Sequence, residues 1–95
     1  TAEVANREAG PAAETVTIAG KYCESGDVLI KEIALPELRP GDLLAMPAAG
    51  AYALPMASNY NAATRPAVVL ARDGEARLIR KRETYANVFA NDVID

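Results

Sequence analysis

One short segment of the chain combines residue types that acid–base chemistry uses. Residues 20–27 read GKYCESGD and place Cys23, the only cysteine of the chain, beside two carboxylic acids, Glu24 and Asp27. The polar and small residues after Cys23 predict a loop between strands, where binding and catalytic residues concentrate. Because neighbouring carboxylates disfavour a thiolate by like-charge repulsion, this cysteine suits a proton donor better than a nucleophile. The alternative is a buried cysteine that acts as a small hydrophobic residue of the core.

A tyrosine further along the chain is a second candidate for binding. Gly50 permits an unusual turn before a helix, and the start of a helix offers N–H groups to a phosphate, to which the Tyr52 hydroxyl could also donate. Tyr52, Met56 and Tyr60 follow at i, i+4 and i+8, so the alternative is a helical stripe that packs in the core. Pro55 suits the first turn of a helix, and we therefore expect the helix to begin at or just before it.

Strands dominate the elements that must position these residues. TVTIAG (15–20) and DVLIKEIAL (27–35) are rich in β-branched residues and predict two strands, one on each side of the cysteine loop. LLAMP (43–47) predicts a third, shorter strand. In residues 65–82, two β-rich runs flank Asp73-Gly74, the pair favoured in tight hairpin turns.

The remaining patterns complete the expected fold. Residues 27–35 alternate, with Val28, Ile30, Glu32 and Ala34 on one face of the strand. Residues 83–94 predict a short helix, and its inward side chains are expected to be Tyr85, Val88, Phe89 and Val93. Because no strand alternates with a long helix, the sequence predicts a mostly β fold, a largely antiparallel barrel or sandwich with one or two short helices.

Composition excludes several functional classes. The chain has 95 residues, enough for a single domain, and its net charge of −3 argues against a nucleic-acid partner. The basic run at 77–82 is therefore expected to be the solvated face of a strand. No apolar run approaches the roughly 20 residues that span a membrane. With no histidine and one cysteine, a metal site and a Cys-His nucleophile are not expected. The first residue is not Met, so we expect a fragment of a longer protein.

Four segments carry a resemblance to a known family. Taken in order, they are GKYCESGD (20–27), GDLLAMPAAGAY (41–52), MASNYN (56–61) and RPAVVLARDGEARLIRKRET (65–84). Together they closely resemble the C-terminal region of the diaminopimelate decarboxylases, which are fold type III enzymes that use pyridoxal 5'-phosphate. The resemblance covers most of the chain, from about Thr15 onward.

The resemblance implies a lyase of lysine biosynthesis. Such an enzyme converts meso-2,6-diaminopimelate to L-lysine and CO2 in the cytoplasm. It also implies an N-terminal (β/α)8 barrel that holds the cofactor on a lysine and a C-terminal, Greek-key-like β-barrel that these 95 residues represent. The family members are homodimers in which each active site is completed by the C-terminal domain of the partner.

The resemblance also implies a role for individual residues. Cys23 matches the cysteine that protonates the substrate carbon after CO2 leaves, and Glu24 matches the carboxylate that binds the distal ammonium group of diaminopimelate. Tyr52 matches a tyrosine that contacts the cofactor phosphate or the substrate carboxylate. Tyr60 is expected to line the pocket, and Asp27 to support the pocket or the dimer contact.

Departures from the family pattern leave alternatives open. Lys21, Lys31 and Lys81 do not lie in a context that resembles the cofactor lysine, so this chain alone is expected to be inactive. Without the strands that the family's barrel takes from elsewhere, it is expected to carry an open sheet edge that promotes association. One alternative is a sister decarboxylase of ornithine, arginine or carboxynorspermidine; an aspartate in place of Glu24 is more typical of the ornithine enzymes. The other alternative is a non-catalytic β-barrel interaction module, in which Cys23 belongs to the core.

Overall fold

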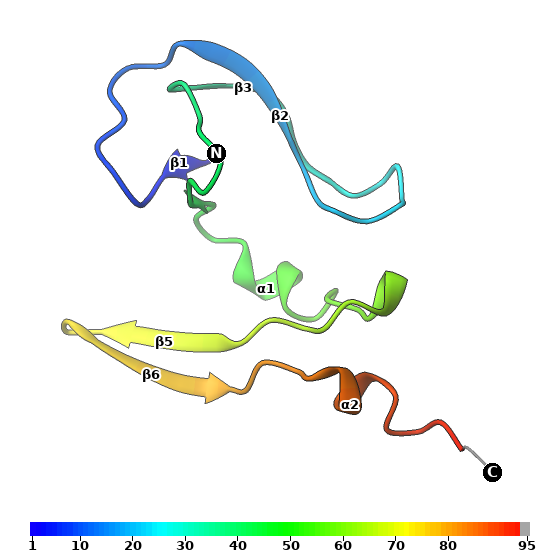
Figure 1. Cartoon of the computed structure of the whole chain (residues 1–95). Helices are drawn as coiled ribbons and strands as arrows, with labels where there is room; N and C mark the ends of the chain where they lie inside the picture. The colour runs from blue at the N-terminus through cyan, green and yellow to red at the C-terminus, as the bar shows by residue number, and fades with distance from the viewer. Residues whose placement is uncertain (94–95) are drawn as a thin grey trace. The chain divides into compact units, whose positions relative to one another are not determined.

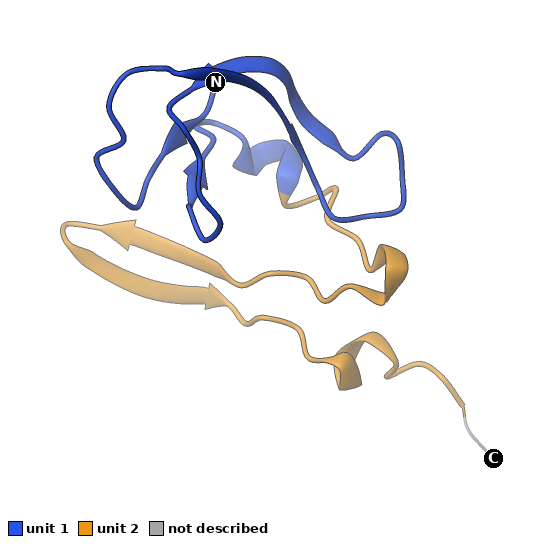
Figure 2. Cartoon of the chain, turned by 45° about the horizontal axis from the view of Figure 1, so that its top comes forward, with its two compact units in different colours: residues 1–53 blue, residues 54–95 orange. Residues whose placement is uncertain are grey.

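The computed structural model describes residues 1–93. Within this range the chain forms six strands, which pair as three separate two-stranded antiparallel sheets, together with two short α-helices and one 3-10 helix (Figure 1). The elements divide between two compact units, residues 1–53 and residues 54–95 (Figure 2). The prediction of a mostly β, antiparallel chain with one or two short helices is confirmed.

The first unit contains two strand pairs and one helix. Its elements are β1 (Glu3–Val4), β2 (Glu14–Ala19), β3 (Val28–Leu35), β4 (Leu44–Ala45) and α1 (Gly50–Ala53). Strand β1 pairs with β4, and β2 pairs with β3. The strands predicted at 15–20 and 27–35 are confirmed, and the one predicted at 43–47 is shorter than expected. Strand β1 was not predicted, because two residues are too few to show an alternating pattern.

A bulge in β3 decides which of its side chains face inward. Val16 pairs with Ile33 and Ile18 pairs with Ile30, so β3 has one residue more than β2 between these pairs. Glu32 lies in this interval with φ 52°, a left-handed conformation. Because the extra residue reverses the alternation, Ile30 and Ile33 are both half-buried. The uninterrupted alternation predicted for residues 27–35 is therefore wrong.

An ion pair joins the beginning of the chain to the turn before β4. Arg7 Nε and Nη2 donate to Asp42 Oδ1 and Oδ2 at 2.9 and 2.8 Å, an arrangement in which two parallel hydrogen bonds fix the relative orientation of both groups. The same carboxylate accepts a hydrogen bond from the Arg39 N–H at 2.8 Å, and Arg7 Nη2 also donates to the Glu37 carbonyl at 2.7 Å. The Arg7 guanidinium and the Arg39 N–H together hold the pKa of Asp42 well below its usual range.

The second unit is organised around one hairpin. Its elements are η1 (Tyr60–Ala62), β5 (Val68–Arg72), β6 (Glu75–Arg80) and α2 (Tyr85–Val88). Between β5 and β6, Asp73 and Gly74 have φ values of 52° and 77°. Two successive left-handed residues match the twist of the flanking strands, so the predicted Asp73-Gly74 hairpin is confirmed.

The predicted start of the helix, at or just before Pro55, is wrong, because α1 begins at Gly50. Helix α1 ends before this residue, and Met56 lies in the turn that follows. Proline lacks an N–H and disfavours the helical conformation of the residue before it, which explains why α1 does not continue. Tyr52 is therefore in α1 while Tyr60 begins η1, and the predicted helical stripe through Tyr52, Met56 and Tyr60 is not formed.

Helix α2 is shorter than the helix predicted over residues 83–94. A capping box begins it: Thr84 Oγ1 accepts a hydrogen bond from the Asn87 N–H at 3.2 Å, and Asn87 Oδ1 accepts one from the Thr84 N–H at 2.8 Å. Tyr85, Phe89 and Val93 were expected inward but are exposed, because one helical turn presents no continuous apolar face. Residue 94 of the predicted helix lies outside the described residues. None of the helices in residues 1–93 has the length and apolar character needed to cross a membrane.

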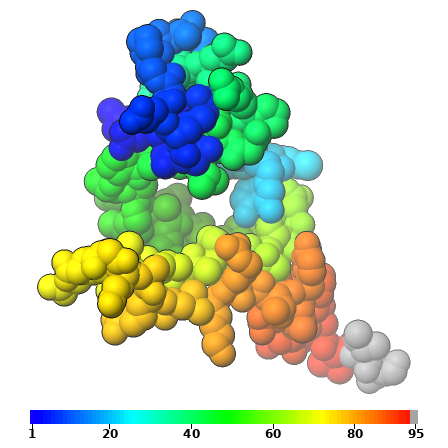
Figure 3. Space-filling model, turned by 60° about the vertical axis from the view of Figure 1, so that its left-hand side comes forward, coloured from blue at the N-terminus to red at the C-terminus, as the bar shows by residue number. Residues whose placement is uncertain are grey.

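Few side chains of the described residues are buried. Among residues 1–93, only Leu35 and Ala63 are buried, at 3% and 9% exposure. All of β6 is exposed, and the space-filling view shows the side chains of the β5–β6 hairpin at the surface, in yellow to orange (Figure 3). No closed sheet is present within this part of the chain. The loops are therefore held mainly by hydrogen bonds.

The Arg7–Asp42 pair predicts a pH-dependent stability. Because the pKa of Asp42 is lowered in the folded protein, the stability from this pair is present above the unfolded pKa of about 4 and is lost as the pH falls through the folded pKa. We expect Asp42→Asn to lower the midpoint of thermal unfolding at pH 7. As the pH is lowered below about 4, the difference from the wild type should shrink progressively.

A matched control exists in the second unit. Asp73 forms an ion pair with Arg72 at 3.5 Å, but the two side chains are 89% and 83% exposed. An exposed pair of this kind contributes little, and asparagine tolerates the left-handed conformation of residue 73. Asp73→Asn should therefore leave the unfolding midpoint almost unchanged. An Asp42→Asn effect that is equally small, or equally large at all pH values, would contradict the stabilising role of the Asp42 charge.

Candidate functional site

The loop that carries Cys23 connects β2 and β3. The Asp27 N–H donates to the Glu24 carbonyl at 3.1 Å, which closes the turn over Ser25 and Gly26, and the Gly20 N–H donates to the Asp27 carbonyl at 2.9 Å. The side chains of Cys23 and Glu24 are exposed. The predicted loop position of Cys23 is confirmed, and its exposure contradicts the alternative of a cysteine buried within these residues.

The Asp27 carboxylate binds the backbone of this loop. Its Oδ2 accepts a hydrogen bond from the Tyr22 N–H at 3.0 Å. A β-carbon at position 20 would collide with the Asp27 carboxylate, so only glycine leaves room for this contact. Asp27 therefore shapes the backbone that presents Cys23.

The Glu24 carboxylate bends back over its own turn. Its Oε2 accepts a hydrogen bond from the Gly26 N–H at 2.7 Å, and a β-carbon at position 26 would lie only 2.5 Å from that oxygen. A carboxylate has about four acceptor positions on its two oxygens, so Glu24 retains the capacity to bind a cation while this bond orients it. The chemistry of the loop is therefore one oriented carboxylate beside one exposed thiol.

Tyr52 lies in the same unit, on α1. Its side chain is 77% exposed, and its N–H donates to the Ala49 carbonyl at 3.3 Å. The backbone N–H is therefore used within the turn, and the phenolic hydroxyl is the group of Tyr52 that can bind a ligand. The alternative in which Tyr52 packs in the core is contradicted within residues 1–93.

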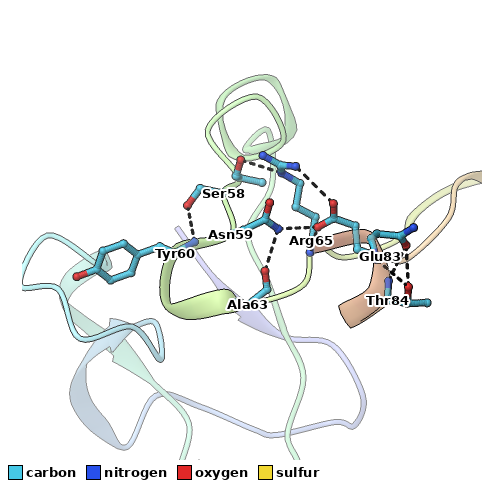
Figure 4. Close-up of polar contacts among 9 residues, drawn as sticks. Ser58, Asn59, Tyr60, Ala63, Arg65, Glu83 and Thr84 are labelled. Atoms are coloured by element: carbon cyan, nitrogen blue, oxygen red, sulfur yellow. Dashed lines mark hydrogen bonds and ion pairs between the residues drawn. The ribbon is translucent and has the colours of Figure 1, made fainter. Parts of the chain in front are cut away.

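Tyr60 belongs to the second unit and begins η1. Its side chain is exposed, and its N–H donates to Ser58 Oγ at 3.3 Å (Figure 4). Asn61 and Ala62 follow with φ values of 57° and 58°. The segment that presents Tyr60 is therefore an irregular turn, not the helix that its spacing predicted.

A polar cluster that the sequence did not reveal lies beside Tyr60. Glu83 Oε1 accepts hydrogen bonds from the Arg65 N–H and from Asn59 Nδ2, both at 2.7 Å, and Glu83 Oε2 lies 3.5 Å from Arg65 Nη1 (Figure 4). The Arg65 N–H and the Asn59 amide hold the pKa of Glu83 below its ordinary value. The only sequence signal for this cluster is the resemblance of its segments, because polar residues 18 and 24 positions apart carry no local pattern.

Within residues 1–93, no group of three or more His, Cys, Asp or Glu side chains could hold a metal ion. The groups that the sequence analysis singled out for binding are the thiol of Cys23, the carboxylate of Glu24 and the hydroxyls of Tyr52 and Tyr60.

Comparison with known proteins places these groups in a family. Residues 1–50 match the family described as the pyridoxal-dependent decarboxylase, C-terminal sheet domain, which covers more than half of the chain. The chain belongs to the pyridoxal-dependent decarboxylase family. Its loop with Cys23 and Glu24 therefore lies in the sheet domain of such decarboxylases.

Curated members of this decarboxylase family are similar over nearly the whole chain. The diaminopimelate decarboxylase of Synechocystis is 52% identical over 91 residues, which are 96% of this chain and 19% of the relative. The diaminopimelate decarboxylase of Bacillus subtilis is 53% identical over 92 residues, which are 97% of this chain and 21% of the relative. The chain thus spans about a fifth of the length of these relatives.

Solved structures of the family have the same fold. The crystal structure of diaminopimelate decarboxylase from M. jannaschii matches with a TM-score of 0.80 at 46% identity, over 86% of this chain and 19% of that one. The same enzyme in co-complex with L-lysine matches equally well, with a TM-score of 0.80. The resemblance found in the sequence is confirmed.

The contact between Gly20 and Asp27 predicts how the cysteine loop can be loosened. In Gly20→Ala, the new methyl group displaces the Asp27 carboxylate and removes the acceptor of the Tyr22 N–H. We expect amide hydrogen exchange at Tyr22 to rise about tenfold, the order expected for a lost charge-assisted hydrogen bond. Asp27→Ala should produce the same increase.

Asp27→Asn is the matched control for this experiment. The asparagine side chain keeps one acceptor oxygen, so it can still bind the Tyr22 N–H and should retain most of the protection. If Gly20→Ala and Asp27→Ala left exchange at Tyr22 unchanged, the carboxylate would have no role in holding the loop.

Proposed function

We propose that the chain is the active-site-completing sheet domain of a diaminopimelate decarboxylase. The observation that carries this proposal is the loop at 20–27, which presents Cys23 and Glu24 in a chain that is 52–53% identical to curated diaminopimelate decarboxylases. The whole enzyme would remove CO2 from meso-2,6-diaminopimelate and leave L-lysine. The co-complex of the M. jannaschii enzyme with L-lysine agrees with that product.

The proposed cofactor is pyridoxal 5'-phosphate. When bound, it withdraws the electron pair that remains on the substrate carbon after the carboxylate bond breaks. The exposed Tyr52 hydroxyl is a donor suited to the cofactor phosphate or to a substrate carboxylate. The covalent attachment lysine is proposed to lie outside this chain, which on its own is then inactive.

Cys23 and Glu24 divide the work on the substrate. Glu24, oriented by the Gly26 N–H, accepts the distal ammonium group of diaminopimelate in a charge-assisted contact. The Cys23 thiol donates its proton to the carbon that has lost CO2, which forms the new C–H bond. Solvent then returns a proton to the exposed sulfur. Asp27 keeps the loop in shape, and Tyr60 lines the pocket.

The proposed homodimer and closed β-barrel rest on the similarity to the diaminopimelate decarboxylases. The whole protein is a homodimer in which this loop reaches the active site of the partner, and the 95 residues are one domain whose β-barrel is closed by strands from elsewhere in the polypeptide. The many exposed apolar side chains, such as Val69, Leu78 and Ile79, support this proposal, because further contacts would cover them. The cytoplasmic location and the absence of nucleic-acid and membrane partners stay predictions.

Substrate choice tests the proposal directly. The full-length protein, supplied with pyridoxal phosphate, should release CO2 from meso-diaminopimelate and not from L-ornithine or L-arginine. The reason is the residue after the cysteine: Glu24 matches the diaminopimelate enzymes, whereas an aspartate at this position is more typical of the ornithine enzymes. Release from ornithine or arginine alone would support the sister decarboxylases instead, and release from none of the three would reject decarboxylation of these amino acids.

Replacing the thiol separates a catalytic role from a structural one. Cys23→Ala in the full-length enzyme should lower kcat by about 10²–10⁴-fold, the usual contribution of a positioned proton donor, while the dimer and its unfolding midpoint stay intact. Ser25→Ala, an exposed change in the same loop, should leave kcat unaltered. The non-catalytic barrel module predicts the reverse for Cys23→Ala, namely lower stability with normal turnover.

A further inference from the structure

The polar cluster in the second unit connects three separate parts of the chain. Glu83 lies just before α2, Arg65 precedes β5, and Asn59 lies at the start of η1. The backbone adds a further link, because the Glu83 N–H donates to the Arg65 carbonyl at 3.1 Å. One carboxylate therefore joins the segments on both sides of the β5–β6 hairpin to η1.

The cluster forms hydrogen bonds at both ends of the turn that carries Tyr60. Asn59 Nδ2, besides its bond to Glu83, donates to the Ala63 carbonyl at 2.9 Å and so spans the turn. Arg65 Nε donates to the Ala57 carbonyl at 3.2 Å, on the other side of Tyr60. Ala63 is also one of the two buried residues of the described chain. The turn 57–63 is therefore held from Glu83 at its beginning and at its end.

The backbone inside this turn needs such support. Asn61 and Ala62 both have left-handed φ values, of 57° and 58°. Asparagine tolerates this conformation, but alanine adopts it at a cost because of its β-carbon. Residues in such conformations persist when the surrounding structure over-determines them, and they concentrate at functional sites. The hydrogen bonds of Asn59 and Arg65 on either side of these residues supply such support.

We propose that Glu83, acting through Asn59 and Arg65, is the positioning residue that fixes the side chain of Tyr60 in the substrate pocket. This inference rests on the proposed function, in which Tyr60 lines that pocket. Glu83 itself touches neither substrate nor cofactor. Its ionised form binds these groups most strongly, because its Oε2 faces a guanidinium group while its Oε1 accepts two N–H groups.

A double-mutant cycle in the full-length enzyme tests the link between Glu83 and Tyr60. With pyridoxal phosphate and meso-diaminopimelate, Glu83→Ala and Tyr60→Ala should each raise KM about tenfold or more, with smaller effects on kcat. Both changes weaken the same contact, the one between Tyr60 and the substrate. The KM of the double variant should therefore be no higher than that of Tyr60→Ala. Effects that multiply, or a Tyr60→Ala variant with wild-type kinetics, would overturn the inference.

Matched variants separate positioning from folding. Glu83→Gln keeps one acceptor oxygen for the Arg65 N–H and Asn59, so it should recover part of the KM; it also replaces Glu83→Ala if that protein does not fold. Arg72→Ala removes the ion pair between Arg72 and Asp73 in the same unit. Because the Arg72 side chain is 83% exposed, this change should leave KM unchanged. An equal KM increase in Arg72→Ala would mean a general loss of structure and would reject the proposed positioning.

Hydrogen exchange provides a readout that does not depend on the substrate. In Glu83→Ala, exchange should rise at the amides of Arg65 and Ala63, while the amides of β5 and β6 keep their protection. Unchanged exchange at Arg65 and Ala63 would overturn the inference even in an active enzyme. An inactive wild type with raised exchange in Glu83→Ala would reject the proposed function. It would still support the conclusion that Glu83 holds the turn 57–63 in place.

Discussion

The loops of this chain cannot be held in place by burial, because only two side chains of residues 1–93 are enclosed. Instead, a carboxylate accepts backbone N–H groups at each critical turn: Asp27 from Tyr22, Asp42 from Arg39 and Glu83 from Arg65. Hydrogen bonds to an ionised acceptor are stronger than neutral ones, so each carboxylate can fix a turn that has no packed core beneath it. The site residues are all carried by turns or by one-turn helices, and the turns that carry Cys23 and Tyr60 are the ones bound by Asp27 and Glu83.

Features that neighbouring residues determine could be predicted from the sequence. The Asp73-Gly74 turn needs two left-handed residues in a row, and that residue pair supplies them at little cost. The loop position of Cys23 followed in the same way, because Ser25 and Gly26 are turn residues between two β-rich runs. The general antiparallel architecture could be inferred for the same reason, since short strands alternate with turns throughout.

Features that depend on distant residues could not be predicted. The bulge at Glu32 depends on how β3 meets β2, and it changes the inward face without any change in composition. Arg7 and Asp42 are 35 residues apart, and their pairing leaves no periodic signal. The spacing of Tyr52 and Tyr60 suggested one helix, but Pro55 interrupts it and the two tyrosines belong to different units. The neighbouring carboxylates suggested that Cys23 donates a proton, but the reaction and the substrate contacts proposed for Cys23 and Glu24 came only from the resemblance.

The contact between Gly20 and Asp27 closes the cysteine loop at its two ends. The Gly20 N–H donates to the Asp27 carbonyl and the Tyr22 N–H donates to the Asp27 carboxylate, so these two bonds fix the two ends of the loop to each other. Lys21 and Ser25 are exposed and make no part of that closure. Positions 21 and 25 can therefore vary while Gly20 and Asp27 are kept constant, because the backbone that presents the thiol is specified by the ends of the loop.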